Sequence, residues 1–218
     1  MNKSLTGLFA LAMVAACGSS SEDVSATGFI TPETTIPATA TAEDGDVPRD
    51  SAGRPFTYAL LGETLPALSG TLVDGSAFST ADLEGQWSVI DVWGLWCSDC
   101  MADAPYVAAL ASAIAQDPDL SFISIHTPPN ASRADEAFGS YGSVEAYFDE
   151  KGYSYATVLD ADASMRDALQ IQWTPTYLLV APDLSVQGFR SDLSAAGGEP
   201  VKDFLQDIAE VKKAYASE

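Results

Sequence analysis

Two cysteines separated by two residues, Cys97 and Cys100, have the spacing in this sequence that most clearly suggests chemistry. They lie in the stretch VIDVWGLWCSDC, in which an apolar run also contains the carboxylate of Asp91. A disulfide across so short a loop adds little stability, because the entropic gain from a cross-link grows with loop length. We therefore interpret the pair as chemical and not as a structural cross-link. Asp91 also needs an explanation, since an unpaired carboxylate in an apolar core is costly.

The elements around the two cysteines predict an α/β domain. A buried strand over 87–93 leads toward Cys97, and the alanines and apolar spacing after it predict a helix over 98–116. Cys97 therefore lies at a helix start, where free N–H groups and the helix dipole stabilise a thiolate. The remaining pattern predicts a hairpin over 65–78, strands at 120–126, 157–159, 176–181 and 186–190, and helices at 143–151, 163–169 and 199–216. This order implies a mixed sheet covered on both faces.

The N-terminus predicts export. Residues 1–16 contain one lysine followed by an apolar run that is too short to span a bilayer, as in a secretory signal. Their end, VAAC, resembles the lipobox of bacterial lipoproteins, and this resemblance implies that Cys17 becomes a lipid-modified first residue. Gly18 then favours the outer membrane over the inner one as the site of the anchor, on the periplasmic side. A plain signal peptide with an incidental cysteine is the alternative.

Composition limits the partners and divides the chain. The 218 residues include 31 acidic and 10 basic ones, a formal net charge of −21. Such a surface repels phosphate backbones, so we expect no nucleic-acid partner. Residues 17–53 are rich in Ser, Thr, Ala, Pro and acidic residues, which predicts a flexible tether. The folded domain is then expected over 54–218.

Two motifs carry a family resemblance. The segment Trp96-Cys97-Ser98-Asp99-Cys100 resembles the thioredoxin active site, and Trp173-Thr174-Pro175-Thr176 resembles the cis-proline loop of the same superfamily. Pro105 and Asp91 match a kinking proline and a buried aspartate found at these places in thioredoxins. The preceding hairpin, the segment 82–85 and the exported context resemble the TlpA/ResA-type branch over residues 60 to 215. The resemblance implies a thioredoxin-like fold, a central mixed β-sheet flanked by helices with an N-terminal β-hairpin, and thiol-disulfide oxidoreductase activity.

The residues of the two motifs then receive roles. Cys97 is the expected nucleophile, and Cys100, one turn into the helix, is the expected resolving thiol of a redox disulfide. A buried carboxylate near Cys100 can accept its proton, because desolvation raises the pKa of an aspartate, so Asp91 is the expected acceptor. An aspartate bonded to local backbone is the alternative.

Substrate contacts are expected from Trp96, Thr174 and Pro175. A cis Pro175 would hold the backbone of Thr174 open for a substrate strand beside Cys97, whereas an ordinary trans turn proline is the alternative. The expected partners are protein thiols and disulfides of exported proteins, together with an unidentified electron-donor redox protein. No dissociable cofactor and no metal are expected.

Charge suggests the direction of electron flow. Asp99 and Asp103 lie in the first turns of the expected helix, and no lysine or arginine lies between Arg54 and Arg133. Negative charge should raise the pKa of Cys97, which makes the dithiol the stronger reductant and favours a disulfide reductase. The chain also departs from its relatives: Ser98-Asp99 replaces a common proline, Trp173 replaces a glycine, Asp103 replaces a glutamate, and the segment 126–143 is longer.

Other functions stay open at this point. A zinc site needs four ligands, and the chain offers one CxxC and one histidine, His126. A copper-delivery protein of the thioredoxin fold would pair the two cysteines with that histidine. A tethered binding module with a decayed site is a third possibility, in which partner binding would survive loss of Cys97.

Overall fold

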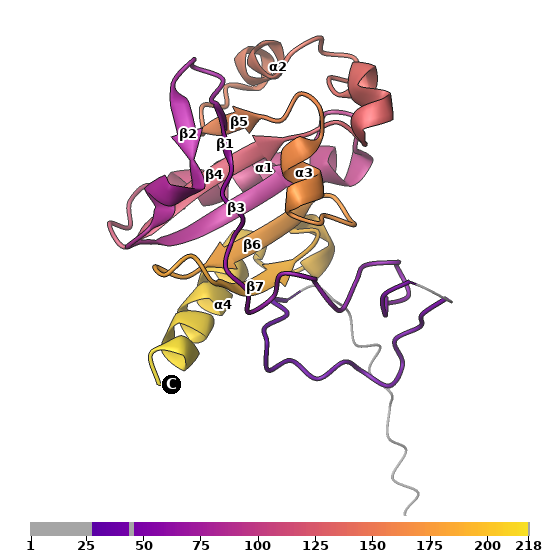
Figure 1. Ribbon diagram of the computed structural model, residues 1–218, viewed down its shortest axis with the longest axis vertical. Coiled ribbons are helices and arrows are strands. Elements are labelled where there is room, and N and C mark those ends of the chain that lie inside the picture. Colours follow the sequence, from indigo (N-terminus) through magenta and orange to yellow (C-terminus); the bar gives the residue numbers. More distant parts are fainter. Residues whose placement is uncertain (1–27, 44–45, 218) are drawn as a thin grey trace, which may run out of the picture.

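The computed structural model describes residues 28–43 and 46–217 of the chain. Its centre is a five-stranded mixed sheet in the order β5-β4-β3-β6-β7 (Figure 1). The strands are β3 (Trp87–Trp93), β4 (Leu120–His126), β5 (Thr157–Leu159), β6 (Thr176–Val180) and β7 (Val186–Arg190). β3, β4 and β5 are parallel, whereas β6 runs antiparallel to both β3 and β7. The expected thioredoxin-like α/β architecture is confirmed.

Helices and short segments connect these strands. The α-helices are α1 (Ser98–Ile114), α2 (Val144–Lys151), α3 (Ser164–Ala168) and α4 (Pro200–Tyr215). The 3₁₀ segments in the described residues are η1 (Thr80–Leu83), η2 (Ala131–Glu136) and η3 (Ser194–Ala196). α1 is two residues shorter than predicted, and η2 occupies part of the long segment 126–143. No helix in the described part of the chain is long and apolar enough to cross a membrane.

The strands of the sheet send alternate residues to two cores. From β3, Val89 packs with α1 and α4, whereas Ile90 and Val92 pack on the other face with residues of α3 and β2. This two-sided burial explains why β3 is apolar almost throughout, as expected for a parallel strand covered on both faces. Asp91 follows Val89 by two residues and shares its face, so it points toward α1.

The predicted N-terminal hairpin is confirmed as β1 (Ser69–Thr71) paired with β2 (Ala77–Ser79). Its turn lies at Asp74–Gly75, where Gly75 has a φ of +87° that favours glycine. The Asp74 carboxylate accepts hydrogen bonds from the amide and the hydroxyl of Ser76. The hairpin lies beside β5, since Leu72 forms an isolated bridge with Val158.

Part of the predicted tether is described and contacts the domain. Ile30 exchanges backbone hydrogen bonds of 2.8 and 2.9 Å with Phe189 of β7, and it is buried. Asp50 is also buried, and its carboxylate pairs with Arg54. These contacts differ from those of a freely extended segment, because Ile30 packs into the core while Ile36 of the same stretch stays exposed. The boundaries 1–16, 17–53 and 54–218 stay predictions, and Cys17 lies outside the described residues.

Candidate active site

The two cysteines lie at the N-terminus of α1, directly beyond the end of β3. Cys97 is the N-cap of α1, and its Sγ accepts the backbone N–H of Cys100 at 3.3 Å. Both are free thiols, and both are buried, with 7% of Cys97 and 3% of Cys100 exposed. The strand therefore delivers Cys97 to the end of the sheet, and the helix places Cys100 one turn deeper.

The loop that contains Thr174 and Pro175 contacts Cys97, as the sequence predicts. The Thr174–Pro175 peptide bond is cis, which confirms that expectation. The carbonyl oxygen of Thr174 accepts the S–H of Cys97 at 3.3 Å. Residues 77 positions apart in the chain are thus in direct contact at the thiol.

Trp96 contacts the segment after β4 and helix α3. Its Nε1–H donates to the carbonyl oxygen of Thr127 at 2.8 Å, and the guanidinium of Arg166 lies 5.7 Å from its ring centroid. A Cβ atom at Gly94 would collide with the indole nitrogen, so this packing requires glycine there. Trp96 is partly exposed, and Arg166 is a neighbour of the site that sequence reasoning did not identify.

Asp91 is buried and incompletely hydrogen-bonded. It is 1% exposed, its Oδ2 accepts the Ser124 hydroxyl at 3.4 Å, and its Oδ1 has no hydrogen-bond partner in the described part of the chain. Burial raises the pKa of Asp91 well above its ordinary value, and the charge of Asp103 adds to this rise. The raised pKa means that this carboxyl takes up a proton more readily than an exposed aspartate does.

The pKa values of the two thiols are shifted in opposite directions. The pKa of Cys97 is lowered to about 7, and hydrogen bonding to the Cys100 thiol is the largest cause. Hydrogen bonds to Thr174 and to the Cys100 amide lower it further, whereas burial of Cys97 raises it. Burial raises the pKa of Cys100 well above its ordinary value, and the charges of Cys97 and Asp91 add to this rise. At neutral pH the Cys97 thiol is therefore the more easily ionised of the two.

The expectation of a raised pKa for Cys97 is wrong, because hydrogen bonds to the thiol outweigh the negative charge nearby. Asp99 does oppose the thiolate, but it is the smallest of the causes. Asp103 is fully buried, and it accepts hydrogen bonds from the Tyr177 hydroxyl at 2.8 Å and from the amides of Leu193 and Ser194 at 2.6 and 2.7 Å. Its carboxylate thus joins α1 to β6 and to the segment after β7. Asp103 has the helical spacing of the apolar residues Val107 and Leu110, and this spacing could have predicted its burial from the sequence.

His126 does not join the cysteines. Its Nε2 accepts the N–H of Leu95 at 3.3 Å, and its ring stacks on Phe138 with centroids 5.3 Å apart. Burial lowers the pKa of His126 to about 4. Its imidazole is therefore neutral at physiological pH, and one nitrogen is already engaged. Within residues 28–43 and 46–217, no group of three or more His, Cys, Asp or Glu side chains is arranged to hold a metal ion.

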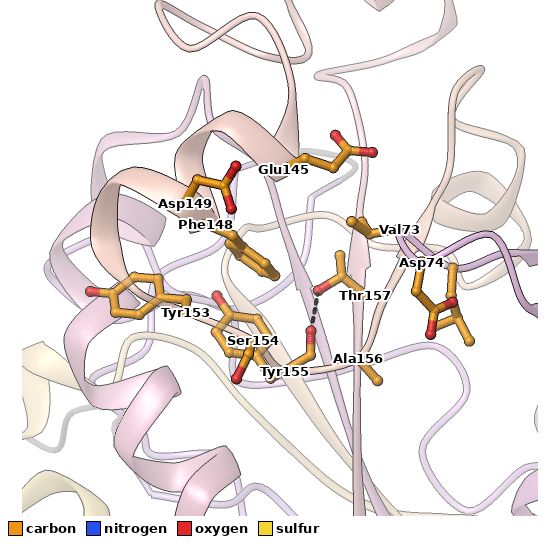
Figure 2. Close-up of a pocket in the computed structure, with 11 residues that line it drawn as sticks. Val73, Asp74, Glu145, Phe148, Asp149, Tyr153, Ser154, Tyr155, Ala156 and Thr157 are labelled. Atoms are coloured by element: carbon orange, nitrogen blue, oxygen red, sulfur yellow. Dashed lines mark hydrogen bonds between the residues drawn. The ribbon is translucent and has the colours of Figure 1, made fainter.

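A cavity of about 270 Å³ lies between the β1–β2 turn, α2 and the segment before β5 (Figure 2). Its walls carry the rings of Phe148, Tyr153 and Tyr155, and its rim carries carboxylates. Figure 2 shows these carboxylates on Asp74, Glu145 and Asp149. None of the predicted site residues lines this cavity, so it is not the expected substrate site.

Comparisons with known proteins agree with this geometry. A family model described as Redoxin matches residues 60–187. The soluble secreted antigen MPT53 of Mycobacterium tuberculosis is 26% identical over 115 residues, which cover 53% of this chain and 59% of that protein. The thiol-disulfide oxidoreductase ResA of Oceanobacillus iheyensis is 22% identical over 137 residues, which cover 63% of this chain and 65% of that protein. The chain thus spans less than two thirds of the length of these relatives.

A solved structure shows the same fold. The thiol:disulfide interchange protein of the thioredoxin family from Chlorobium tepidum superposes with a TM-score of 0.51 at 20% sequence identity. The superposition covers 68% of this chain and 94% of the other. The shared architecture is that of a thioredoxin-like domain.

Proposed function

Because the chain belongs to the Redoxin family, we propose that it is an exported thiol-disulfide oxidoreductase that reduces disulfides in other proteins. One observation carries the proposal most directly: the Cys97 thiol, with a pKa of about 7, lies against the carbonyl of Thr174 in the cis-proline loop. An extended substrate strand placed beside this loop would bring its disulfide to the thiolate.

The first half of the reaction belongs to Cys97. Its thiolate attacks one sulfur of the substrate disulfide, so a Cys97–substrate bond forms, the substrate S–S bond breaks, and the second substrate sulfur leaves as a thiolate. At neutral pH about half of a thiol with a pKa of about 7 is ionised, which keeps the nucleophile available. In this proposal Trp96, Thr174 and Pro175 contact the substrate.

Cys100 and Asp91 complete the exchange. Cys100 gives its proton to the Asp91 carboxylate and attacks the Cys97 sulfur, which releases the remaining substrate sulfur as a thiolate. Two electrons have then passed from Cys97 and Cys100 to the substrate, and its two thiolates are protonated, one by the proton held on Asp91 and one by solvent, which had taken up the Cys97 proton. The resulting Cys97–Cys100 disulfide needs an electron-donor redox protein to restore the dithiol.

The reductive direction rests on a different reason from the one the sequence suggested. A nucleophilic cysteine with a pKa near about 7 is typical of thioredoxin, whereas strongly oxidising members of this fold have values near about 3.5. The pKa of Cys97 falls at the thioredoxin end of this range. Less stabilisation of the reduced thiolate makes the dithiol a better reductant.

The place of action follows from the N-terminal sequence. We propose cleavage after residue 16 and attachment of the mature chain to the periplasmic face of a bacterial membrane through lipid-modified Cys17. The secreted relative MPT53 supports export. Copper delivery is not favoured, because His126 is turned to Leu95 and Phe138.

Trapping of mixed disulfides tests the assigned roles. Cys100→Ser should accumulate a covalent complex with the natural partner, because no thiol can release it, whereas Cys97→Ser should not. Both variants are expressed in the native host and analysed by non-reducing gels and mass spectrometry. Equal trapping by both variants would refute the assignment. Unimpaired partner function in Cys97→Ser would point instead to a binding module.

A further inference from the structure

A buried group of charged side chains connects the N-terminal segment to the region of the proline loop. Arg54 Nε donates to Asp50 Oδ2 at 2.8 Å, and an Arg54 NH group lies 3.7 Å from Asp192 Oδ2. Asp50, Arg54 and Asp192 are 7%, 8% and 8% exposed. Asp50 belongs to the segment before the predicted domain, whereas Asp192 follows β7. Arg54 therefore bridges two parts of the chain that are far apart in sequence.

Trp173 links this group to the proline loop. Its Nε1–H donates to Asp192 Oδ1 at 3.5 Å, so one carboxylate contacts both Arg54 and the indole. The ring also lies over Gly53, where an added Cβ would be 3.6 Å from it and where the φ of +87° favours glycine. The carbonyl of Trp173 accepts the Thr176 hydroxyl at 2.8 Å. Trp173 is thus fixed on both sides, immediately before Thr174.

The groups that act on the Asp192 carboxylate come from several elements. Arg54 faces it from the N-terminal segment and Trp173 from the proline loop, while Asp99 and Asp103 of α1 act on it through their charges. A buried ion pair contributes little net stability compared with apolar packing, because desolvation offsets the attraction. Separating the partners is costly, however, because each would be left as an unpaired buried charge, and this cost disfavours other arrangements of the segments that they join. The pair's location beside the proposed substrate loop indicates what this fixed geometry serves.

We propose that Arg54 and Asp192 are positioning residues of the redox site: they hold Trp173, and through it the Thr174 carbonyl that faces Cys97. The segment around Arg54 is then part of the substrate-docking structure and not only a connection to the membrane. This inference rests on the proposed function, because it concerns the same thiol and the same docking loop. It also gives a role to the tryptophan that replaces the usual glycine.

The test compares three variants in the full chain carrying Cys17→Ser, which leaves Cys97 and Cys100 as its only thiols. Arg54→Met removes the bridge, and Arg54→Lys keeps the charge without the planar fork. Arg133→Met is the matched control, because Arg133 makes an exposed ion pair with Glu136. The readouts are kcat and KM for reduction of a peptide disulfide with dithiothreitol as the reductant, and the pH dependence of Cys97 alkylation by iodoacetamide.

A misplaced docking loop should act mainly on substrate binding. For Arg54→Met we expect KM to rise about tenfold with a smaller change in kcat, since small displacements of positioning groups reduce productive binding. The alkylation midpoint should move upward, because hydrogen bonding to the Thr174 side chain is one of the causes that lower the pKa of Cys97 and a displaced loop weakens it. Arg54→Lys should fall between Arg54→Met and the wild type, and Arg133→Met should match the wild type in both readouts.

The outcomes separate this inference from the proposed function. A wild-type chain without disulfide reduction contradicts the function itself. An active wild type with Arg54→Met indistinguishable from Arg133→Met overturns the positioning role alone. If circular dichroism shows that Arg54→Met is unfolded, Asp192→Asn replaces it, since this variant breaks the same pair while Asp50 retains Arg54. An unchanged KM in Asp192→Asn then overturns the inference.

Discussion

Replacement of Cys100 by alanine should raise the pKa of the Cys97 thiol. Hydrogen bonding to the Cys100 side chain is the largest cause that lowers this pKa from 9.0 to about 7. A hydrogen bond to a charged group contributes about 1.5–3 kcal/mol. Since one pKa unit corresponds to about 1.4 kcal/mol, the midpoint of Cys97 ionisation should rise by about one to two units.

The midpoint of Cys97 ionisation changes more clearly than the alkylation rate at a single pH. At pH 7 the ionised fraction should fall from about half to about 1–10%. A thiolate of higher pKa is intrinsically more nucleophilic, with a Brønsted coefficient of about 0.4–0.5, so the alkylation rate at pH 7 falls only about two- to sixfold. The plateau rate at high pH should rise about three- to eightfold for the same reason. The midpoint is therefore the decisive quantity, and a single rate at neutral pH is not.

The assay is iodoacetamide alkylation from pH 5 to about pH 10 in the Cys17→Ser background, followed by mass spectrometry. Cys100→Ser is the matched control, because its hydroxyl can still donate a hydrogen bond to the Cys97 thiolate. Its midpoint should stay closer to that of the reduced wild type. A midpoint in Cys100→Ala equal to the wild-type value would show that the helix terminus alone sets the acidity of Cys97, and the reasoning would fail.

Two further predictions concern Asp91 and the redox couple. Asp91→Asn should slow release of the partner from the mixed disulfide in single-turnover experiments. It should also stabilise the fold at neutral pH: the raised pKa of Asp91 means that its stabilising contribution is present at low pH and lost as pH rises through the folded-state pKa. Urea denaturation at several pH values should show a wild-type deficit that disappears in acid, and parallel curves would contradict the assignment. The Cys97–Cys100 couple, equilibrated with dithiothreitol buffers, should have a reduction potential of about −250 mV or below, whereas about −120 to −180 mV would indicate an oxidase or isomerase.

The thiol motif and the fold could be predicted because their signals are local. Cys97 and Cys100 are three positions apart, and the strand and helix around them have clear periodicity. Thr174 and Pro175 form a recognisable tetrapeptide with their neighbours. Each of these features can be recognised in the sequence without knowledge of the three-dimensional contacts. The structure accordingly brings Thr174 to Cys97 as the motif implied.

The electrostatics of the site could not be predicted in the same way. Asp103 is six residues from Cys97 in sequence, but its carboxylate turns to Tyr177, Leu193 and Ser194, whose donors come from much later in the chain. Arg54 meets Asp192 across more than half of the chain, and neither residue belongs to a motif. The expected direction of the Cys97 pKa shift was wrong because its largest cause, hydrogen bonding to the Cys100 thiol, depends on side-chain geometry that the sequence does not show.

The isolated bridges outside the sheet also affect how the protein behaves among its own copies. β5 and β7 are the two edge strands, and Leu72 pairs with Val158 on one while Ile30 pairs with Phe189 on the other. An uncovered edge presents N–H and C=O groups that can recruit a strand from a second molecule. Residue 30 lies before the stretch 60–187 that matches the family model, whereas residue 72 lies within it. A chain that began at residue 60 would therefore keep the cover on β5 but lose the pairing of Ile30, and strand-to-strand self-association would be directed to the edge of β7 at Phe189.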